Sequence, residues 1–481
     1  MKNSVPKPKP AGFRLWASLA TLGLACSAAV AQPVQTVSAT APLANNAAQA
    51  IDLSRAWRLM LLNDHTYQAA ISEQAAAQTE RSQGRAGLLP QVQAGYSRSK
   101  ITGTSSQPNF LGRRVSSDLD YDSSNTYVQL RQPLLNYGRY AYYQRGNALA
   151  QQGVAVFSVK RQEAGLRLAS AYFNVLLAHD DVVLRQSLAA SLEGRAKAFE
   201  AQYRQSEGTR IDAQETRARL AVARADEIDA QDYLVVASRE LQALLSLPPQ
   251  HIAALRADFP LPPLMPPSLD EWLSRARVNN ASVLAAQEAV NVAEAEVDQA
   301  ASRYLPTMDL VASYGKANSE NLSSLSQRSN SFTVGIQVNI PIFTGGYTTA
   351  SVARARHDRS RLQFELSAAL ERTLAEVTRQ YTNVSGGAER IKALQSAVES
   401  GRISLESANK GFALGAWSNL DVLRAEDNLY QAKYELAKAK LEYLQSRLSL
   451  AAAAGDLNSG PFDEINDIYL GSVISLNGVS H

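Results

Sequence analysis

The sequence is poor in the residues that build metal sites and disulfides. It has one cysteine, Cys26, and five histidines that lie far apart. A disulfide needs two cysteines, and a metal site needs several ligands at short spacings. The sequence also lacks a glycine-rich phosphate loop and a nucleophile elbow. We therefore expect no enzyme activity, no cofactor and no bound metal.

Long apolar runs are also missing after the first 31 residues, so no membrane-spanning helix of about 20 residues is expected. Residues 1–31 have the pattern of a cleaved secretory signal, with four basic residues before an apolar stretch that ends in Ala-Val-Ala. Removing this signal changes the formal net charge from +3 to −1, so we expect no nucleic-acid partner. Gly23 stands where a lipidation site usually has an aliphatic residue, so we expect Cys26 to carry no lipid. An exported chain of this kind is either soluble or crosses a membrane as β-strands.

The chain contains an internal duplication. "LNDHTYQAAISEQAAAQTERSQGRAGLLPQ" (62–91) aligns without gaps with "VNNASVLAAQEAVNVAEAEVDQAASRYLPT" (278–307), and "VQLRQPLL" (128–135) aligns with "IQVNIPIF" (336–343). A segment rich in proline separates the copies and cannot be helical throughout. The expected organisation is a signal over 1–31, an N-terminal extension over 32–50, a first repeat over 51–247, a linker over 248–267, a second repeat over 268–452 and a tail over 453–481.

Each repeat contains two segments that alternate between apolar and polar residues, the period of a β-strand. They lie at about 91–100 and 124–133, and at about 307–316 and 332–341. Roughly ten residues suffice for a tilted strand to cross a bilayer, although a strand in a soluble sandwich would look similar. Aromatic residues gather at one common end of the set, as at a membrane interface. These are Tyr137, Tyr140, Tyr142, Tyr143, Tyr304, Phe343 and Tyr347.

A proline stands near each expected junction between strand and helix, and we interpret the four as swivels: Pro90, Pro133, Pro306 and Pro341. Four strands cannot close on themselves, because the smallest membrane barrels need about eight. The strands must therefore be shared between copies of the chain. The pattern leaves two, three or four copies open.

Very long helices are expected in both repeats. The stretches Gly146 to Gln205 and Tyr347 to Phe412 contain no proline and would extend roughly 90 and 100 Å as helices. Helices of this length need coiled-coil partners. A seam with alternating steps of four and three residues is formed by Leu370, Leu374, Val377, Tyr381, Val384, Ala388 and Ile391, and it has a counterpart in Tyr430, Tyr434, Ala437, Leu441, Leu444 and Leu448.

With these features, "NIPIFTGG" (339–346) and "NLDVLRAEDNLYQAKYELAKAKLEYL" (419–444) make the sequence resemble the TolC family of outer-membrane channel-tunnels over nearly the whole mature chain. The resemblance implies an α+β membrane protein in the outer membrane of a Gram-negative bacterium. It implies a homotrimer in which each chain gives four strands to one β-barrel, continued by a long periplasmic α-helical coiled-coil barrel. Outer-membrane lipid, a periplasmic adaptor and an inner-membrane ABC or proton-driven transporter are the implied partners.

The turns between the long helices are expected near Gly208 and Gly415, and the resemblance implies that they form the periplasmic gate. Asp421 matches a pore-lining aspartate of the family, whereas Arg424 replaces the acid that follows it. Asp212 fits the family's aspartate beside the first turn.

The family's latch across the tip has a tyrosine and an arginine at the second turn. Here Phe412 and Trp417 occupy those positions, and Arg210 is a candidate for the missing cation. Thr209 with Asp212, and Ser418 with Asp421, also have the spacing of a capping box that starts a helix. Capping is the favoured interpretation for Asp212, whereas capping and pore lining are compatible for Asp421. Arg424 also fits an outward-facing helix charge.

The resulting functional hypothesis is a passive exit duct that receives substrate from a pump, most simply for type I secretion of a protein such as a toxin. Small-molecule or multidrug efflux is the alternative. A soluble periplasmic coiled-coil adaptor without a pore is the second alternative.

Overall fold

The computed structural model describes residues 50–207, 209–319 and 327–476. The expected signal with Cys26, nearly all of the N-terminal extension, and Gly208 lie outside these residues. The first repeat contains α2 (Leu53–Asn63), α3 (His65–Ala86), β1 (Gln91–Pro108), β2 (Arg114–Leu135), α4 (Tyr137–Arg204) and α5 (Arg210–Leu245). After β3 (His251–Leu255), the second repeat contains α6 (Leu269–Asn279), α7 (Ala281–Ala301), the short 3-10 helix η2 (Ser302–Tyr304), β4 (Thr307–Ser319), β5 (Gln327–Asn339), α8 (Tyr347–Ala413) and α9 (Asn419–Ala454), followed by α10 (Ser459–Tyr469) and β6 (Leu470–Ser475).

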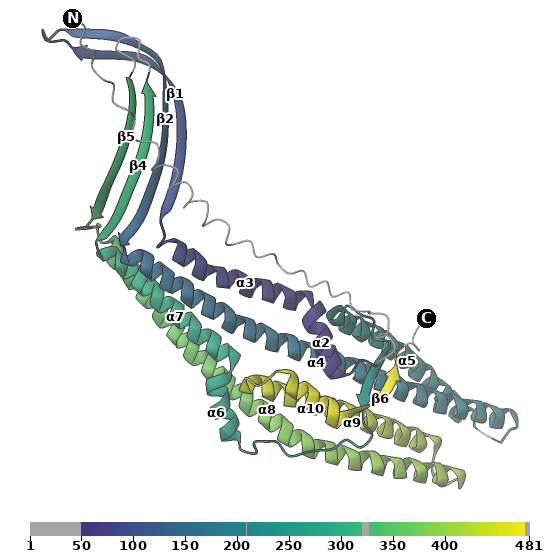
Figure 1. The fold of residues 1–481 in the computed structure, drawn as a ribbon. Coiled ribbons are helices and arrows are strands. Elements are labelled where there is room, and N and C mark those ends of the chain that lie inside the picture. The colour runs from purple at the N-terminus through teal and green to yellow at the C-terminus, as the bar shows by residue number, and fades with distance from the viewer. Residues whose placement is uncertain (1–49, 208, 320–326, 477–481) are drawn as a thin grey trace, which may run out of the picture. The chain divides into compact units, whose positions relative to one another are not determined.

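Four strands form one antiparallel sheet in the order β1-β2-β4-β5 (Figure 1). β4 and β5 have 13 residues each, whereas β1 and β2 have 18 and 22. The expectation of strands about ten residues long was therefore too short. Most of the segment between 101 and 123, which separates the two expected strands of the first repeat, continues the strand pair.

One face of this sheet is apolar across all four strands. Neighbouring strands pair Tyr314 with Phe332, and Leu310 with Ile336. The same face continues through Val128, which pairs with both Tyr314 and Ala94. No helix of the described residues covers it in the single chain, where Phe332 and Ile336 are 72% and 63% exposed (Figure 1). An apolar face of this extent needs a partner other than water.

The long helices are α4 with 68 residues and α8 with 67, each about 100 Å by the helical rise. α4 begins at Tyr137, nine residues before the expected start. Both coiled-coil seams are found: Val377, Val384 and Ile391 of α8 and Leu444 of α9 are almost completely buried. Across the described ranges, no helix has both the length and the hydrophobicity that a membrane span requires.

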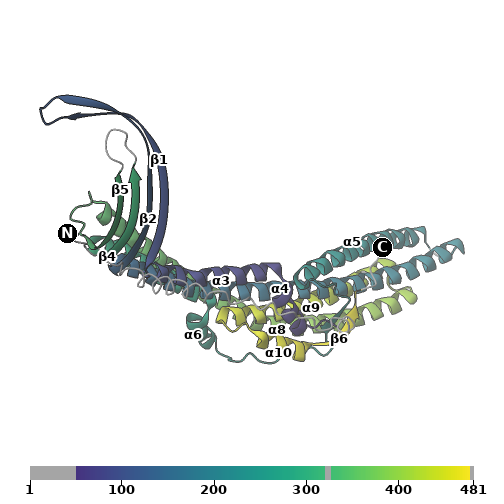
Figure 2. The ribbon, with the colours of Figure 1, turned by 45° about the horizontal axis from the view of Figure 1, so that its top comes forward.

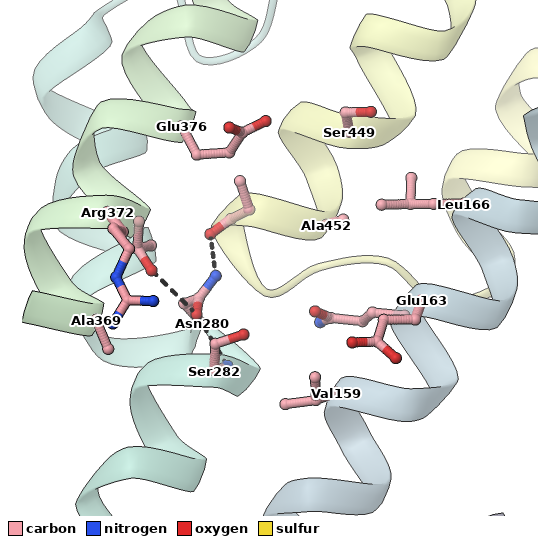
Figure 3. Close-up of a pocket in the computed structure, with 13 residues that line it drawn as sticks. Val159, Glu163, Leu166, Asn280, Ser282, Ala369, Arg372, Glu376, Ser449 and Ala452 are labelled. Carbon is pink, nitrogen blue, oxygen red and sulfur yellow. Dashed lines mark hydrogen bonds between the residues drawn. The ribbon is translucent and has the colours of Figure 1, made fainter. Parts of the chain in front are cut away.

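Shorter helices stack end to end beside the long ones (Figures 1 and 2). Asn63, which precedes α3, donates its side-chain amide to the carbonyl of Leu245 at the end of α5, at 2.9 Å. Asn280 caps the start of α7 and donates to the carbonyl of Ala453 at the end of α9, also at 2.9 Å (Figure 3). We call these two places the helix joints. At each one, a helix C-terminus meets a helix N-terminus.

A small layer packs around the joints. β3, from the proline-rich linker, pairs with β6, from the expected tail, and α10 packs against α2. Trp57 of α2 stacks on Phe462 of α10 with ring centroids 4.7 Å apart. The buried hydroxyl of Tyr172 donates to the carbonyl of Ala253 in β3 at 2.6 Å. The expected C-terminal tail thus contributes buried side chains to the core, among them Phe462 and Tyr469.

Candidate functional site at the turns between the long helices

The second turn joins α8 to α9 and is built around Gly415. Its φ of +72° lies in the left-handed region that favours glycine. The amide groups of Ala416 and Trp417 donate back to the carbonyl of Gly411, at 2.9 and 3.3 Å. The Trp417 ring lies against Gly411, where a Cβ atom would stand 2.9 Å from the ring. Both glycines therefore hold Trp417 at the end of α8, where it is half exposed.

Ser418 and Asp421 form a complete capping box at the start of α9. The Asp421 amide donates to the Ser418 hydroxyl at 3.3 Å, and the Ser418 amide donates to the Asp421 carboxylate at 3.0 Å. The hydrogen bond from the Ser418 side chain, followed by its backbone amide and the charge of Arg424, lowers the pKa of Asp421 below its usual range. Asp421 thus combines the cap with a carboxylate that stays ionised at neutral pH.

Arg424 lies one turn beyond Asp421 on the same side of α9 and is exposed. Its positive charge stands close enough to act on the Asp421 carboxylate. The first turns of α9 therefore present a negative and a positive side chain close together.

The first turn joins α4 to α5, and Gly208 within it lies outside the described residues. Thr209 caps α5 by accepting from the Asp212 amide at 3.1 Å, which agrees with the capping interpretation of Asp212. Arg210 is exposed. Within the described part of the chain, no hydrogen bond or ion pair joins Asp212 or Arg210 to the second turn.

A buried contact that the sequence analysis missed joins the two turns. Asn419, the first residue of α9, is 1% exposed and donates its amide to the hydroxyl of Thr216 on α5 at 3.0 Å. Thr216 is completely buried, and the side-chain oxygen of Asn419 has no partner. Because an unpaired buried amide costs about 1–3 kcal/mol, this contact favours the packed arrangement of the two helix pairs.

Three further polar links join the pairs farther from the turns. Arg195 of α4 donates to Asn409 of α8 at 2.7 Å and lies 3.5 Å from Glu426 of α9. Arg219 of α5 and Asp427 of α9 form an ion pair at 2.8 Å.

The last link is between Tyr430 of α9 and Asp181 of α4, with an O···O distance of 2.6 Å. Burial, followed by the hydrogen bond to the negative Asp181, raises the pKa of Tyr430. We call these four links, from Thr216–Asn419 to Asp181–Tyr430, the hairpin latch. All four hold α4 and α5 to α8 and α9.

Apolar contacts accompany the hairpin latch. The ring of Phe412 packs edge-on against Phe199 of α4, with centroids 5.6 Å apart. Leu192 and Leu220 pack with Leu423 in one buried cluster. Phe412 is thus an apolar contact between α8 and α4, at the position where the family has a tyrosine.

The four prolines differ in position. Pro90 and Pro306 directly precede β1 and β4, and Pro341 lies two positions after the end of β5. Pro133 lies inside β2, opposite Asp309, where the register shifts before Leu135. The strand therefore ends two residues after Pro133 and not at it. β2 tolerates this proline because the irregular pairing there needs no hydrogen bond from a backbone N–H, which proline lacks.

The described residues contain no group of three or more metal-ligating side chains. A cavity of about 400 Å³ lies over the second joint, between α4, α7, α8 and α9. Its lining residue Asn280 is already bonded to Ala453 and to the amides that it caps (Figure 3).

Comparison with known proteins gives a consistent result. The family model "Outer membrane efflux protein" matches two segments, residues 56–246 and 272–456, which overlap the two expected repeats. Alkaline protease secretion protein AprF of Pseudomonas aeruginosa is 35% identical over 86% of this chain and 86% of its own length. Proteases secretion protein PrtF of Dickeya chrysanthemi is 34% identical over 86% of this chain and 90% of its own length.

Among solved structures, the CmeC outer membrane channel of Campylobacter jejuni is similar, with a TM-score of 0.72. It covers 86% of this chain and 89% of that channel, at 16% sequence identity. The fold of strands and long helices is therefore the fold of that channel, as the resemblance to the TolC family implied.

Proposed function

Because this chain belongs to the outer membrane efflux protein family, we propose that it is the exit duct of a type I secretion system. The outer-membrane localisation expected from the sequence is confirmed by the family. The duct would take a substrate from an inner-membrane transporter and a periplasmic adaptor and release it outside the cell. It would catalyse no reaction.

The sheet supports assembly from several copies. β1 and β5 are its two edges, and four alternating strands leave these edges antiparallel to each other. The β5 of one chain can therefore pair with the β1 of the next without changing the pattern, which removes every open edge. The family resemblance favours three copies, with 12 strands in the closed barrel by the count of four per chain.

The uncovered apolar face of the sheet is the observation that carries this proposal. In a closed barrel it would meet lipid, while the opposite face, with Gln93 and Gln129, would line the pore. Such a face argues against the soluble adaptor.

We propose that the turns between the long helices close the periplasmic end of the duct. The hairpin latch would hold α8 and α9 against α4 and α5 until the pump and adaptor dock. Asp421 and Arg424 would then set the charge at the entrance. The buried contact of Asn419 and the ring contact of Phe412 with Phe199 would replace the family's latch of tyrosine and arginine. The four prolines would act as swivels between barrel and helices.

We propose that the cargo is a protein, such as a secreted protease or toxin, that passes through the duct unfolded and folds outside the cell. AprF and PrtF, whose names state protease secretion, support this choice by their similarity over 86% of the chain. Small-molecule efflux is the second candidate, which the family's description as an efflux protein favours.

A pair of neighbouring substitutions tests the membrane orientation. Ile336→Arg places a charge on the apolar face, at a cost of up to about 2–4 kcal/mol in lipid, whereas Gln337→Arg places it on the polar face. We expect Ile336→Arg to lose most of the outer-membrane oligomer and secretion of a co-expressed protease, and Gln337→Arg to keep both. Equal behaviour of the two variants would contradict the proposed membrane face.

A further inference from the structure

The β1–β2 strand pair reaches far beyond the rest of the sheet. β2 pairs with β4 only from Ser123 onward, whereas its pairing with β1 continues to Pro108 and Arg114. Residues 100–122 thus form a two-stranded ribbon, which we call the outer ribbon. It bends across the ends of β4 and β5 (Figures 1 and 2).

The two faces of the strand pair exchange their polarity at the start of the outer ribbon. Pairing runs without a register shift from Gln91 to Pro108, so each face can be followed along its whole length. On the face that is apolar in the sheet, Val92, Ala94 and Tyr96 are followed by Arg98 and Lys100.

Those two cations form ion pairs with the opposite strand, Arg98 with Asp122 at 2.7 Å and Lys100 with Asp120 at 3.1 Å. Asp118 follows on the same face. Apart from Pro108 beside the tip, this face of the outer ribbon carries only polar and charged side chains and cannot lie in lipid.

The opposite face changes in the other direction. In the sheet it carries Gln91, Gln93 and Gly95. In the outer ribbon it carries Ile101 of β1 and three apolar residues of β2, namely Tyr121, Leu119 and Val115. At the tip, Phe110 and Leu111 are 95% and 69% exposed. In the paired strands, the large apolar side chains of the outer ribbon are therefore on the face that would point toward the pore axis.

We propose that the outer ribbons of neighbouring copies meet through this face and form a lid over the external mouth of the duct. This inference rests on the proposed function, because only a closed ring brings the pore-side faces together. A second copy of the chain is the occupant that the pattern favours, since lipid would contact the charged face. The ion pairs on the outside would keep the lid soluble at the cell surface.

Engineered cysteines test the lid, because the expected mature chain contains no cysteine after Cys26 is removed. Leu119→Cys lies on the apolar face, and Asp118→Cys, the adjacent residue, is the matched control on the charged face. After mild oxidation of intact cells, we expect about half of the Leu119→Cys chains in disulfide-linked dimers and at least fivefold less for Asp118→Cys. In a ring of three, one cysteine per chain can link at most two of the three.

A second variant joins Lys100 to Asp122 by a short Asn-Gly turn and so removes the outer ribbon. We expect it to form the same oligomer and to show a larger single-channel conductance than the parent. An oligomer that conducts but gives equal cross-linking at both positions, or unchanged conductance without the ribbon, would overturn the lid and leave the duct intact. Absence of both oligomer and channels in the parent would overturn the proposed function as well.

Discussion

The two repeats of the chain solve the same packing problem with different chemistry. At the first joint, Asp64 caps α3, is buried and forms an ion pair with Arg167 of α4. At the second joint the aligned residue is Asn280, which caps α7 and bonds to Ala453. A charge with a cation partner and a neutral amide with a carbonyl partner thus stand at equivalent capping positions, and at the first joint the bond to the helix-end carbonyl comes from Asn63 instead. At this place the fold requires a side chain that caps the helix with one oxygen and whose other polar atoms are hydrogen-bonded or ion-paired.

The turns at the opposite ends of the helices differ more. In the first repeat, the residue after the cap is Arg210, which is exposed, whereas in the second it is Asn419, which is buried. The start of α9 therefore places a polar side chain between the helix pairs, and α5 supplies its acceptor, Thr216. Duplicated elements have become two complementary sides of one contact.

The largest expected effect concerns the helix ends at the joints. α5 and α9 both end in the left-handed conformation, at Ser246 with φ +55° and at Gly455 with φ +87°. A Cβ atom at Gly455 would stand 2.2 Å from the backbone oxygen of Asn279. Gly455→Ala should therefore destabilise the protein by roughly 2–5 kcal/mol. Ser246→Ala is the control, since a side chain already fits there, and should change stability by less than about 1 kcal/mol. Loss of the helical circular-dichroism signal on heating measures both, and similar transition temperatures would contradict the comparison.

The second prediction exchanges the capping residues between the joints. Asn280→Asp removes the proton that is donated to Ala453 and places a carboxylate near that carbonyl, so we expect a cost of about 2–4 kcal/mol. Asp64→Asn keeps the capping oxygen, and water can solvate Arg167, whose side chain is 42% exposed. Its cost should be nearer about 1 kcal/mol. Equal losses of thermal stability in the two variants would show that the joints do not differ in this way.

The third prediction breaks the contact between the turns. Thr216→Val keeps the shape of the side chain and leaves the Asn419 amide without its partner, which weakens the closed packing by about 1–3 kcal/mol per chain. We expect the channel to open more often in planar bilayers. Thr378→Val is the control, because that hydroxyl is exposed and bonds only to its own helix. An unchanged opening frequency in Thr216→Val would exclude this link from the gate.

The smallest effects concern charge at the second turn. Arg424→Asp should increase cation selectivity and Asp421→Asn should decrease it, as measured by reversal potentials in a salt gradient. The pKa of Asp421 is lower in the folded protein than the usual aspartate value of 3.8, so its carboxylate is ionised and caps α9 at every pH above 3.8. The charge and the cap are lost only as the pH falls through the lower folded pKa. The selectivity difference between the parent and Asp421→Asn should thus be the same at pH 7 and pH 5. Unchanged reversal potentials in both variants would leave these residues as a cap and a surface charge.

The sequence carried enough information for the strands, the long helices and their seams, because each has a period that extends over many residues. It did not reveal the outer ribbon, where serine and threonine in β1 and serine and aspartate in β2 obscure the alternation between 98 and 122. The pairing of β3 with β6 was missed because each strand is short and its partner is far along the chain.

The hairpin latch was missed for a related reason. Asn419 and Thr216 are single polar residues separated by 203 positions, and neither belongs to a recognisable motif. An asparagine directly after a capping serine, at the start of an apolar helical seam, was the one available signal. Only the fold shows that its side chain is buried against α5.

The conductance of the purified protein in planar lipid bilayers tests the central claim most directly. If several copies of this chain close into a duct, single channels with discrete conductance steps will appear in a lipid bilayer without any pump or adaptor. Complete absence of channels at all voltages and salt concentrations, from protein that is folded and oligomeric, would contradict the account.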